Sequence, residues 1–256
     1  MLGRTPPKGS DWIHQPKFDG YRFLIAKIGQ RVRLYSKSGV EWSDRLPDVA
    51  EAFAALRTDF ILDGELCLCD GRGRSDFRTL HAEMRQRRPD TSRMAYYAFD
   101  LLFEHDVDLR RLALSERQRD LTRLCNKARK EVPYLFLVES FPEGEPLLEW
   151  CEHYELEGIV SKRLSSRYSS GACRDWQKTK CNSWRKVNQF RHKLFEGRKK
   201  PRQLTERDRA LVRKREELAR IRERLRDADL SQSLARELTK QQALLEREIA
   251  ELERLS

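Results

Sequence analysis

The sequence predicts an α+β domain built on a largely antiparallel sheet, followed by an all-helical C-terminal tail. Up to Gly197, short runs rich in β-branched and aromatic residues alternate with segments of helical pattern. Two of these runs flank a tight turn, as the strands of a hairpin do. Beyond Gly197 the strand signals stop and leucines recur at helical spacing.

The strands of the predicted sheet are apolar runs bounded by turn residues. YRFLIAKI (21–28) and RVRLYS (31–36) flank the Gly29-Gln30 turn and predict a hairpin. Four further strands are expected over FILDGELCLC (60–69), MAYYAFDLLF (94–103), YLFLV (134–138) and EGIVSKR (157–163), with the turn DGRGR (70–74) after the first. Helices are expected around residues 44–56, 76–87, 115–130 and 145–154. These elements predict a folded domain over residues 1–190.

The C-terminal tail has the pattern of an amphipathic helix pair. Apolar residues recur at spacings of three, four and seven on both sides of the break DADLSQS (227–233). They are Leu211, Leu218, Ile221 and Leu225, then Leu238, Leu245, Ile249 and Leu252. Glu and Arg fill the positions between them, as on a solvated face. We expect a helical hairpin or coiled coil over residues 205–256, packed on itself, on the domain or on a second copy.

The charge balance indicates a polyanionic partner. The 52 basic and 41 acidic residues give a net charge of +11, which favours nucleic acid or an acidic membrane surface. A basic linker over residues 191–204 contains RKKPR, which has no helical face to decorate, so its side chains are candidates for phosphate contacts. These DNA-binding candidates are Arg198, Lys199, Lys200 and Arg202.

Neither a membrane segment nor a zinc module is expected. No run approaches the roughly 18 apolar residues of a membrane span, and the first residues carry no apolar signal segment. The six cysteines form no CxxC pair and have no His cluster beside them. Free thiols fit a reduced, cytoplasmic protein, and a DNA partner would associate it with the nucleoid.

The stretch HQPKFDGYRF (14–23) places Lys17 beside Asp19, Gly20 and Arg22. A lysine amine attacks only when neutral, and roughly 1 in 2,500 lysines is neutral at pH 7. Neighbouring cations or a bound metal raise that fraction. Gly20 would let the backbone turn tightly, and Asp19 would anchor the turn or orient a ligand hydroxyl. Taken alone, KxDGxR is better explained as a surface turn.

Five further blocks follow this stretch in order. They are YSKSG (35–39), LDGEL (62–66), YYAFDLL (96–102), LEGIVSKR (156–163) and DWQKTK (175–180). The ordered series resembles the nucleotidyltransferase (adenylation) domain of ATP-dependent DNA ligases, and within that family the bacterial ligase D type of end joining. The resemblance covers roughly residues 10–181. It implies an antiparallel-sheet, ATP-grasp-like adenylation fold for the domain.

The resemblance also implies a reaction. Lys17 would attack the α-phosphate of ATP and form lysyl-AMP, and the AMP would then pass to the 5′-phosphate of a DNA nick. Attack by the 3′-hydroxyl would seal the nick and release AMP. The implied partners are nicked or broken double-stranded DNA in repair and recombination by non-homologous end joining. A Ku-like end-binding protein is left open as a recruiter.

The chemistry requires cations around the phosphates and oxygen ligands for Mg²⁺ or Mn²⁺. Lys178 and Lys180 alternate as on a strand, which places both ammonium groups on one face. Lys162 is a further cation candidate. Glu65 and Glu157 lie in apolar runs, where an unpaired charge is costly, and are the expected metal ligands. Asp63 is a less certain ligand, and its alternative role is to turn the strand.

The adenine base requires a flat apolar surface. Phe99 matches the adenine-stacking aromatic of the family, and Ile159 or Val160 could close the opposite face. Tyr97, Phe99 and Leu101 also alternate as an ordinary buried strand face would. Asp100 points to the other side and is expected to be structural.

The sequence departs from the family at three places. Gln15 stands where the family usually has a Glu that reads the adenine amino group, although the amide oxygen of Gln15 can still accept from that group. Lys37 replaces an arginine, which keeps the charge and loses the bidentate fork. The segment after Cys181 shows too few strands for the usual OB barrel. Self-adenylation is then expected to be slow or partner-dependent, with the tail and the basic cluster serving as a DNA clamp.

Two other functions compete with a DNA ligase. An RNA ligase or a guanylyl-transferring capping enzyme would use the same lysine chemistry. A non-catalytic DNA-binding protein would be a decayed ligase core that presents its tail to repair partners. The intact acidic and basic set of the blocks argues against decay, and the wording AFDLL and EGIVSKR favours the DNA ligase.

Overall fold

The structure is a computed structural model that describes residues 2–70, 74–171, 173–188, 214, 221, 225 and 232–254. It divides into two compact units, Met1–Phe190 and Arg191–Ser256. Each unit is described by itself.

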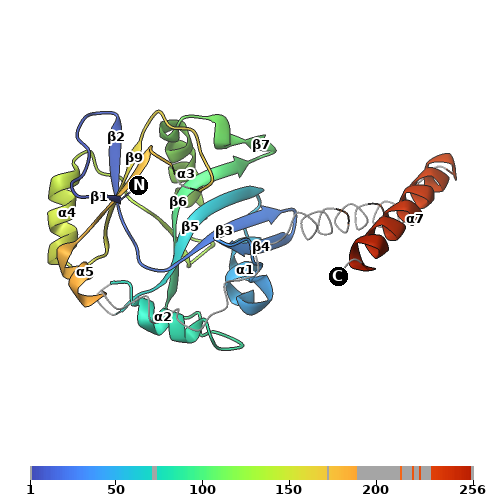
Figure 1. The fold of residues 1–256 in the computed structure, drawn as a ribbon, viewed down its shortest axis with the longest axis horizontal. Helices are drawn as coiled ribbons and strands as arrows, with labels where there is room; N and C mark the ends of the chain where they lie inside the picture. Colours follow the sequence, from blue (N-terminus) through green and yellow to red (C-terminus); the bar gives the residue numbers. More distant parts are fainter. Residues whose placement is uncertain are drawn as a thin grey trace. The chain divides into compact units, whose positions relative to one another are not determined.

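The first unit contains two β-sheets that lie next to one another (Figure 1). The four-stranded sheet has the order β1 (Leu2–Gly3), β10 (Trp176–Lys180), β9 (Gly158–Arg163) and β2 (Trp12–Pro16). The larger sheet has the order β4 (Arg31–Ser36), β3 (Tyr21–Ile28), β5 (Phe60–Leu68), β6 (Met94–Glu104) and β7 (Val107–Asp108), with β8 (Leu135–Leu137) on β6. All pairs are antiparallel except β1–β10 and β6–β8. The predicted α+β architecture with a largely antiparallel sheet is therefore confirmed.

The main core lies between the larger sheet and two helices. Helices α1 (Pro47–Ala54) and α3 (Leu114–Ala128) bury Phe53 and Leu121 against Phe23 and Tyr96. Burial of such side chains contributes about 1.5–3 kcal/mol each and fixes the sheet on which half of the site is built. Helix α2 (Phe77–Glu83) follows β5, and two short 3-10 turns complete the unit, η1 (Ser43–Arg45) and η2 (Leu109–Arg111).

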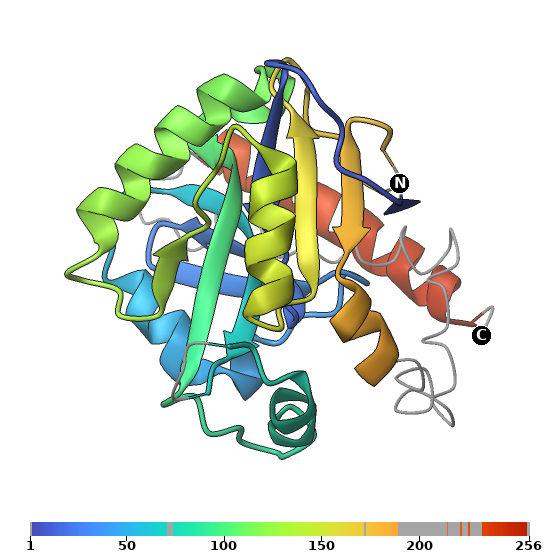
Figure 2. The same ribbon diagram turned by 90° about the vertical axis from the view of Figure 1, so that its left-hand side faces the viewer.

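A second, smaller core covers the outer face of the four-stranded sheet. Helices α4 (Gly144–His153) and α5 (Asn182–Val187) follow β8 and β10, and Leu147 and Cys151 of α4 pack on Ile159 of β9. Figure 2 shows α4 lying over this sheet. The inner face of the sheet, which turns away from α4, is therefore left for function.

The hairpin was predicted with the correct ends, whereas β2 was not predicted. Strands β3 and β4 span residues 21–28 and 31–36, and Gly29 takes the positive φ of 58° that their tight turn requires. Strand β2 has the sequence WIHQP, in which apolar and polar residues do not alternate. Its two buried residues, His14 and Gln15, are polar, so no apolar pattern marks the strand. Its pairing with β9 determines that it is a strand.

The second unit contains helix α7 (Gln232–Arg254). A small apolar cluster is buried in this unit, and Leu225 packs against it. It consists of Ile221 and, from α7, Leu238, Leu245 and Ile249. Leu211, Leu218 and the side chain of Leu252 lie outside the described residues. The linker 191–204 lies there too, with Arg198, Lys199, Lys200 and Arg202. The helical hairpin or coiled coil therefore stays a prediction.

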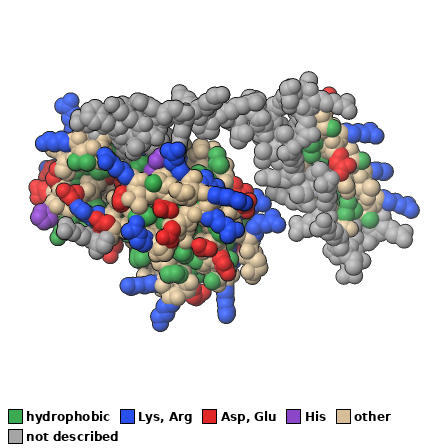
Figure 3. Space-filling view, turned by 90° about the horizontal axis from the view of Figure 1, so that it is seen from below, with side chains coloured by type: hydrophobic (Ala, Val, Ile, Leu, Met, Phe, Trp, Pro, Cys, Tyr) green, Lys and Arg blue, Asp and Glu red, His purple; other side chains and the backbone are tan. Residues whose placement is uncertain are grey.

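Charged side chains are interspersed on the surface. Figure 3 shows Lys and Arg mixed with Asp and Glu on the face drawn, with apolar side chains scattered between them. Within the described residues, no helix has the combination of length and apolar composition that a bilayer crossing requires.

Candidate active site

Strand register arranges several of the predicted site residues in two rows on the inner face of the four-stranded sheet. Val160 on β9 pairs with Gln15 of β2 and Lys178 of β10. Gly158 pairs with Lys180 of β10, and its carbonyl accepts at 2.7 Å from the amide of Lys17, the residue after β2. Paired residues of antiparallel strands point to the same face. The rows are Gln15–Val160–Lys178 and Lys17–Gly158–Lys180.

Two glycines let the backbone approach closely at this face. Gly158 has φ of +139°, and a Cβ there would lie 2.1 Å from the carbonyl oxygen of Thr179. A Cβ on Gly20 would lie 2.3 Å from the carbonyl oxygen of Leu66 on β5. Gly20 does not have a positive φ. The glycine of the Lys17 stretch therefore allows this close approach to β5, which a side chain would block.

Glu157 holds Lys17 and Lys180 at the centre of the site. The Lys17 Nζ lies 2.6 Å from Glu157 Oε2, and the Lys180 Nζ lies 2.9 Å from Glu157 Oε1. Burial alone would raise the pKa of the Glu157 carboxyl, but the two ammonium groups outweigh burial and hold its pKa below the usual value. Glu157 therefore stays ionised and fixes the Lys17 amine in place.

Glu65 is the second carboxylate of this centre. Its Oε1 accepts from the Gly20 amide at 3.2 Å. Burial raises the pKa of Glu65 to about 7; attraction by Lys17 opposes this, and repulsion by Glu157 adds to it. The structure thus brings together Lys17, Glu65 and Glu157, which the sequence placed in three separate blocks.

Arg22 forms an ion pair with a buried carboxylate. Its Nε and Nη2 donate to the two oxygens of Asp63 at 2.9 and 2.5 Å, and the Tyr168 hydroxyl donates to Asp63 Oδ2 at 2.8 Å. Asp63 is fully buried. Asp63 therefore serves as the counter-ion of Arg22, and nothing in the sequence indicated Tyr168 as its second partner.

Phe99 projects from β6 among cationic groups. The Arg22 guanidinium lies 5.5 Å and the Lys162 ammonium 4.5 Å from its ring centre. Lys162 also donates to the Phe99 carbonyl at 3.1 Å and lies 4.1 Å from the Trp176 ring centre. Burial lowers the pKa of Lys162 to about 7. The structure thus groups Lys162 with Phe99, and its ammonium has no contact with Lys17 or Glu157.

Of the two residues expected opposite Phe99, only Val160 lies on the inner face. Ile159 is fully buried in the outer core with Leu147 and Cys151. Tyr97 and Phe99 are half-buried, and Asp100 is buried in an ion pair with Arg117, as a structural residue would be.

The buried side-chain amide of Gln15 has hydrogen-bond partners for its nitrogen and none for its oxygen among the described residues. Its Nε2 donates to Gln118 Oε1 at 3.1 Å and to Ser140 Oγ at 3.0 Å. Its Oε1 has no hydrogen-bond partner in the part of the chain that the structure describes. Gln118 in turn donates to the Phe99 carbonyl at 2.7 Å. No sequence pattern pointed to Gln118, which lies in a polar helical stretch with no motif.

Lys37 and Asp19 lie at the edges of the site. Desolvation and repulsion from Lys17 and Lys37 lower the pKa of Lys178, so these ammonium groups act on one another. Asp19 accepts from the Trp184 indole at 3.2 Å, which ties the Lys17 stretch to α5.

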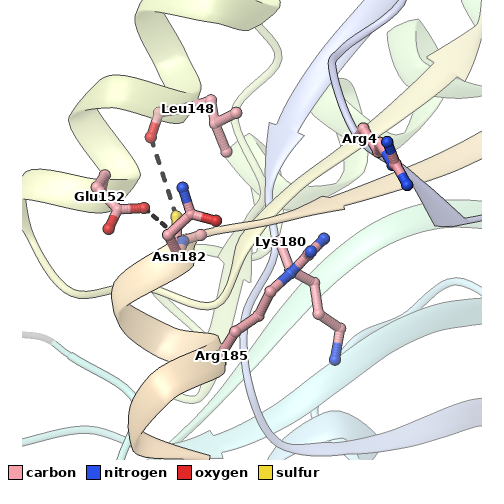
Figure 4. A pocket seen from close by; sticks show the side chains of 7 residues that line it. Arg4, Leu148, Glu152, Lys180, Asn182 and Arg185 are labelled. Atoms are coloured by element: carbon pink, nitrogen blue, oxygen red, sulfur yellow. Dashed lines mark hydrogen bonds between the residues drawn. The ribbon is translucent and has the colours of Figure 1, made fainter.

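A hollow of about 280 Å³ adjoins Lys180 (Figure 4). Arg4 and Arg185 add guanidinium groups to its lining. The Glu152 carboxylate accepts hydrogen bonds from the backbone amides of Asn182 and Ser183, both at 2.7 Å. The side of the site that adjoins Lys180 is therefore basic.

The carboxylates of the site suit a metal bound together with phosphates. Within the described ranges, no three His, Cys, Asp or Glu side chains form a ready-made metal cage. Mg²⁺ commonly takes one or two protein carboxylates and completes its shell with phosphate oxygens and water. Glu65 and Glu157 fit that donor set.

Comparison of the sequence with known protein families identifies the family of this chain. The family profile described as "ATP dependent DNA ligase domain" matches residues 6–180. The chain belongs to the ATP-dependent DNA ligase family. The family predicted from the ordered blocks is thereby confirmed.

Curated relatives place the chain close to the ligase D type. It is 37% identical over 181 residues to the multifunctional non-homologous end joining protein LigD of Pseudomonas aeruginosa, covering 70% of this chain and 21% of that protein. It is 33% identical over 177 residues to the LigD of Mycobacterium bovis, covering 68% of this chain and 22% of that protein. The chain thus spans about a fifth of the length of these relatives.

Solved ligase structures share the fold. A mycobacterial DNA ligase D complexed with ATP and MES matches with a TM-score of 0.62 at 28% identity, over 70% of this chain and 58% of that one. The ligase domain of M. tuberculosis LigD matches with a TM-score of 0.61 at 29% identity, with the same coverage. The first unit is therefore a mixed α/β nucleotidyltransferase-like ligase domain.

Proposed function

We propose that this chain is an ATP-dependent DNA ligase whose nucleophile is Lys17. The observation that carries the proposal is the pair of contacts by which Glu157 holds the amines of Lys17 and Lys180 beside the row Gln15–Val160–Lys178. A lysine needs such a fixed position, among cations that attract phosphate, to attack a nucleotide.

In the first step a bond forms between Lys17 Nζ and the α-phosphorus of ATP, and the bond to the pyrophosphate oxygen breaks. The Lys17 ammonium loses two protons: one leaves to solvent and gives the neutral amine that attacks, and the second leaves as the N–P bond forms, by way of Glu157 Oε2, 2.6 Å from Nζ, which passes it to solvent and is ionised again. Lys178, Lys180 and Arg22 supply positive charge around the phosphates. Lys37 adds to that charge from the turn after β4.

The base lies between Phe99 and Val160, with the unpaired Oε1 of Gln15 at its edge. Stacking on one aromatic ring is worth about 1–3 kcal/mol per base. Glu65 and Glu157 hold Mg²⁺ or Mn²⁺ when it is bound, and the ion supplies charge neutralisation at the phosphates. Asp19 and Gly20 keep the Lys17 stretch against α5 and β5.

The AMP then passes from Lys17 to the 5′-phosphate of nicked or broken DNA, and the 3′-hydroxyl displaces it. The relatives are named for non-homologous end joining, which supports repair of breaks as the setting. A Ku-like end-binding protein is the proposed recruiter, and the nucleoid the proposed place of action. Family membership favours this function over an RNA ligase, a capping enzyme or a decayed core.

Label transfer tests this function. The purified chain is incubated with Mg²⁺ and ATP labelled at the α-phosphate, run on a denaturing gel, and chased with nicked duplex DNA. We expect label on the wild type and on the control Lys8→Ala, an exposed lysine, and none on Lys17→Ala. Label that moves to DNA and leaves as sealed product establishes the complete reaction.

Two other outcomes lead elsewhere. Sealing of a nick that already carries AMP, without label from ATP, means that a partner performs the first step. Absence of both activities contradicts the proposed function and favours the non-catalytic alternative.

The tail and its basic cluster are proposed as a DNA clamp. Each neutralised phosphate adds about 0.9 to the slope of binding against salt on a logarithmic scale. Deleting residues 198–256 should weaken binding to nicked DNA and flatten that slope. Unchanged binding and slope would exclude the clamp.

A further inference from the structure

The Phe99 carbonyl fixes the direction in which the Gln118 amide points. The Phe99 oxygen lies 2.7 Å from Gln118 Nε2. A backbone carbonyl only accepts hydrogen bonds, so the atom of Gln118 that faces it must be the amide nitrogen. The oxygen of the same amide is then directed at Gln15, whose Nε2 lies 3.1 Å away.

Gln15 is oriented by this contact and by two further acceptors. Its Nε2 lies 3.0 Å from the Ser140 hydroxyl and 3.5 Å from the Val138 carbonyl, which also can only accept. The nitrogen is therefore held on this side, and the oxygen is left on the other. That oxygen is buried and has no partner among the described residues. Buried acceptors nearly always have a hydrogen-bond partner, so an unpartnered one needs an explanation.

Both residues that flank the proposed base are connected to this pair of glutamines. Phe99 is bonded to Gln118 through its carbonyl, and Val160 is the strand neighbour of Gln15. Gln118 thus forms hydrogen bonds with both Phe99 and Gln15.

We propose that Gln118 is a positioning residue for base selection. It orients Gln15 so that Oε1, an acceptor, meets the exocyclic amino group of adenine. Guanine carries a carbonyl oxygen at that place, so two acceptors would face each other, and an unsubstituted purine would leave Oε1 unpaired. The inference rests on the proposed function, because it takes the base to lie against Phe99 and Val160.

The test compares three nucleotides at equilibrium. Calorimetry on the full chain measures the affinity of ATP, GTP and purine riboside triphosphate, which lacks the amino group. The variants are Gln118→Leu, which removes both contacts, and Gln118→Glu, which replaces the amide nitrogen that faces the Phe99 carbonyl with an oxygen. Arg119→Ala is the control, since Arg119 is exposed on the same helical turn.

We expect the wild type and Arg119→Ala to prefer ATP over purine riboside triphosphate by about tenfold or more. Gln118→Leu should reduce that preference to within about twofold. Gln118→Glu should weaken it too, because two acceptors would face each other at Phe99. The affinity for purine riboside triphosphate should be unchanged in both variants. General damage would weaken all three nucleotides alike.

The inference is overturned if Gln118→Leu keeps the preference, or if the wild type binds ATP and purine riboside triphosphate equally. Should Gln118→Leu fail to fold, an undiminished preference in Gln118→Glu overturns it. The nucleotide preference is a property of equilibrium binding, whereas the lysyl adduct requires the covalent step. A wild type that prefers ATP and forms no lysyl adduct therefore contradicts the proposed reaction while supporting the role of Gln118.

Discussion

Lys17 and Glu157 form a 2.6 Å ion pair, although 140 positions separate them in the sequence. The pair joins the end of β2 to the start of β9, and the second oxygen of Glu157 is occupied by Lys180 of β10. One carboxylate therefore aligns three strands and the proposed nucleophile.

Glu157→Gln tests the importance of that alignment. The substitution keeps the size of the side chain and removes the negative charge that holds both amines. We expect formation of lysyl-AMP to fall by about 10²-fold or more, the scale on which lost electrostatic positioning acts. Rates of label incorporation measure it. Glu145→Gln, at an exposed carboxylate that pairs with Lys8, should leave the rate unchanged. An equal rate in Glu157→Gln would show that Glu157 does not position Lys17.

Arg117→Met tests the buried ion pair beneath the site. Arg117 and Asp100 are both fully buried, bonded at 2.8 and 2.9 Å, and Arg117 also donates to the carbonyls of Leu112 and Ser166. Removing one partner leaves an uncompensated buried charge, so the free energy of unfolding should fall by about 3–5 kcal/mol. Urea unfolding measures it. The double variant with Asp100→Leu should recover part of the loss; no recovery would contradict the charge explanation.

Lys162→Met tests the pH dependence of stability. The pKa of Lys162 is about 7 in the folded protein and 10.5 ordinarily. Between these pH values Lys162 is protonated in the unfolded chain and largely neutral in the folded protein. The contribution of Lys162 to the free energy of unfolding therefore rises with pH. The advantage of the Met variant over the wild type should therefore shrink from pH 7 to pH 10, by at most ~1.4 kcal/mol per unit. Unfolding at several pH values checks this, and a constant difference would contradict it.

Gly158→Ala tests the close approach of β9 and β10. Gly158 combines a positive φ with a predicted Cβ contact of 2.1 Å to Thr179, whereas Gly9 has φ of +114° and no described atom within 4 Å of its Cβ position. Gly9→Ala should therefore cost about 1 kcal/mol from backbone strain alone. Gly158→Ala should cost several times more and reduce labelling of Lys17. Equal losses of stability in the two variants would refute the steric explanation.

Local patterns in the sequence predicted those parts of the fold that are set by neighbours in the chain. The β3–β4 hairpin follows from alternating apolar residues around Gly29, and the shared face of Lys178 and Lys180 follows from strand periodicity. Lys17, Glu65 and Glu157 could be selected because their blocks resemble a family, and the structure places them together.

Contacts between distant segments were not predictable in the same way. Strand β2 is defined by its pairing with β9, and no apolar alternation marks it. Gln118 and Tyr168 act through partners 103 and 105 positions away, Gln15 and Asp63. Glutamine in a polar helix and tyrosine in a loop are common, so their types carry no signal until the partners are seen.

The most direct measurement is the site of nucleotide attachment. The chain is incubated with ATP and Mg²⁺, digested, and the peptides are sequenced by mass spectrometry under conditions that preserve phosphoramides. We predict AMP on the peptide that contains Lys17, and on no peptide that contains only Lys162, Lys178 or Lys180. AMP on one of those lysines, or on none, would contradict the assignment of Lys17 as the nucleophile.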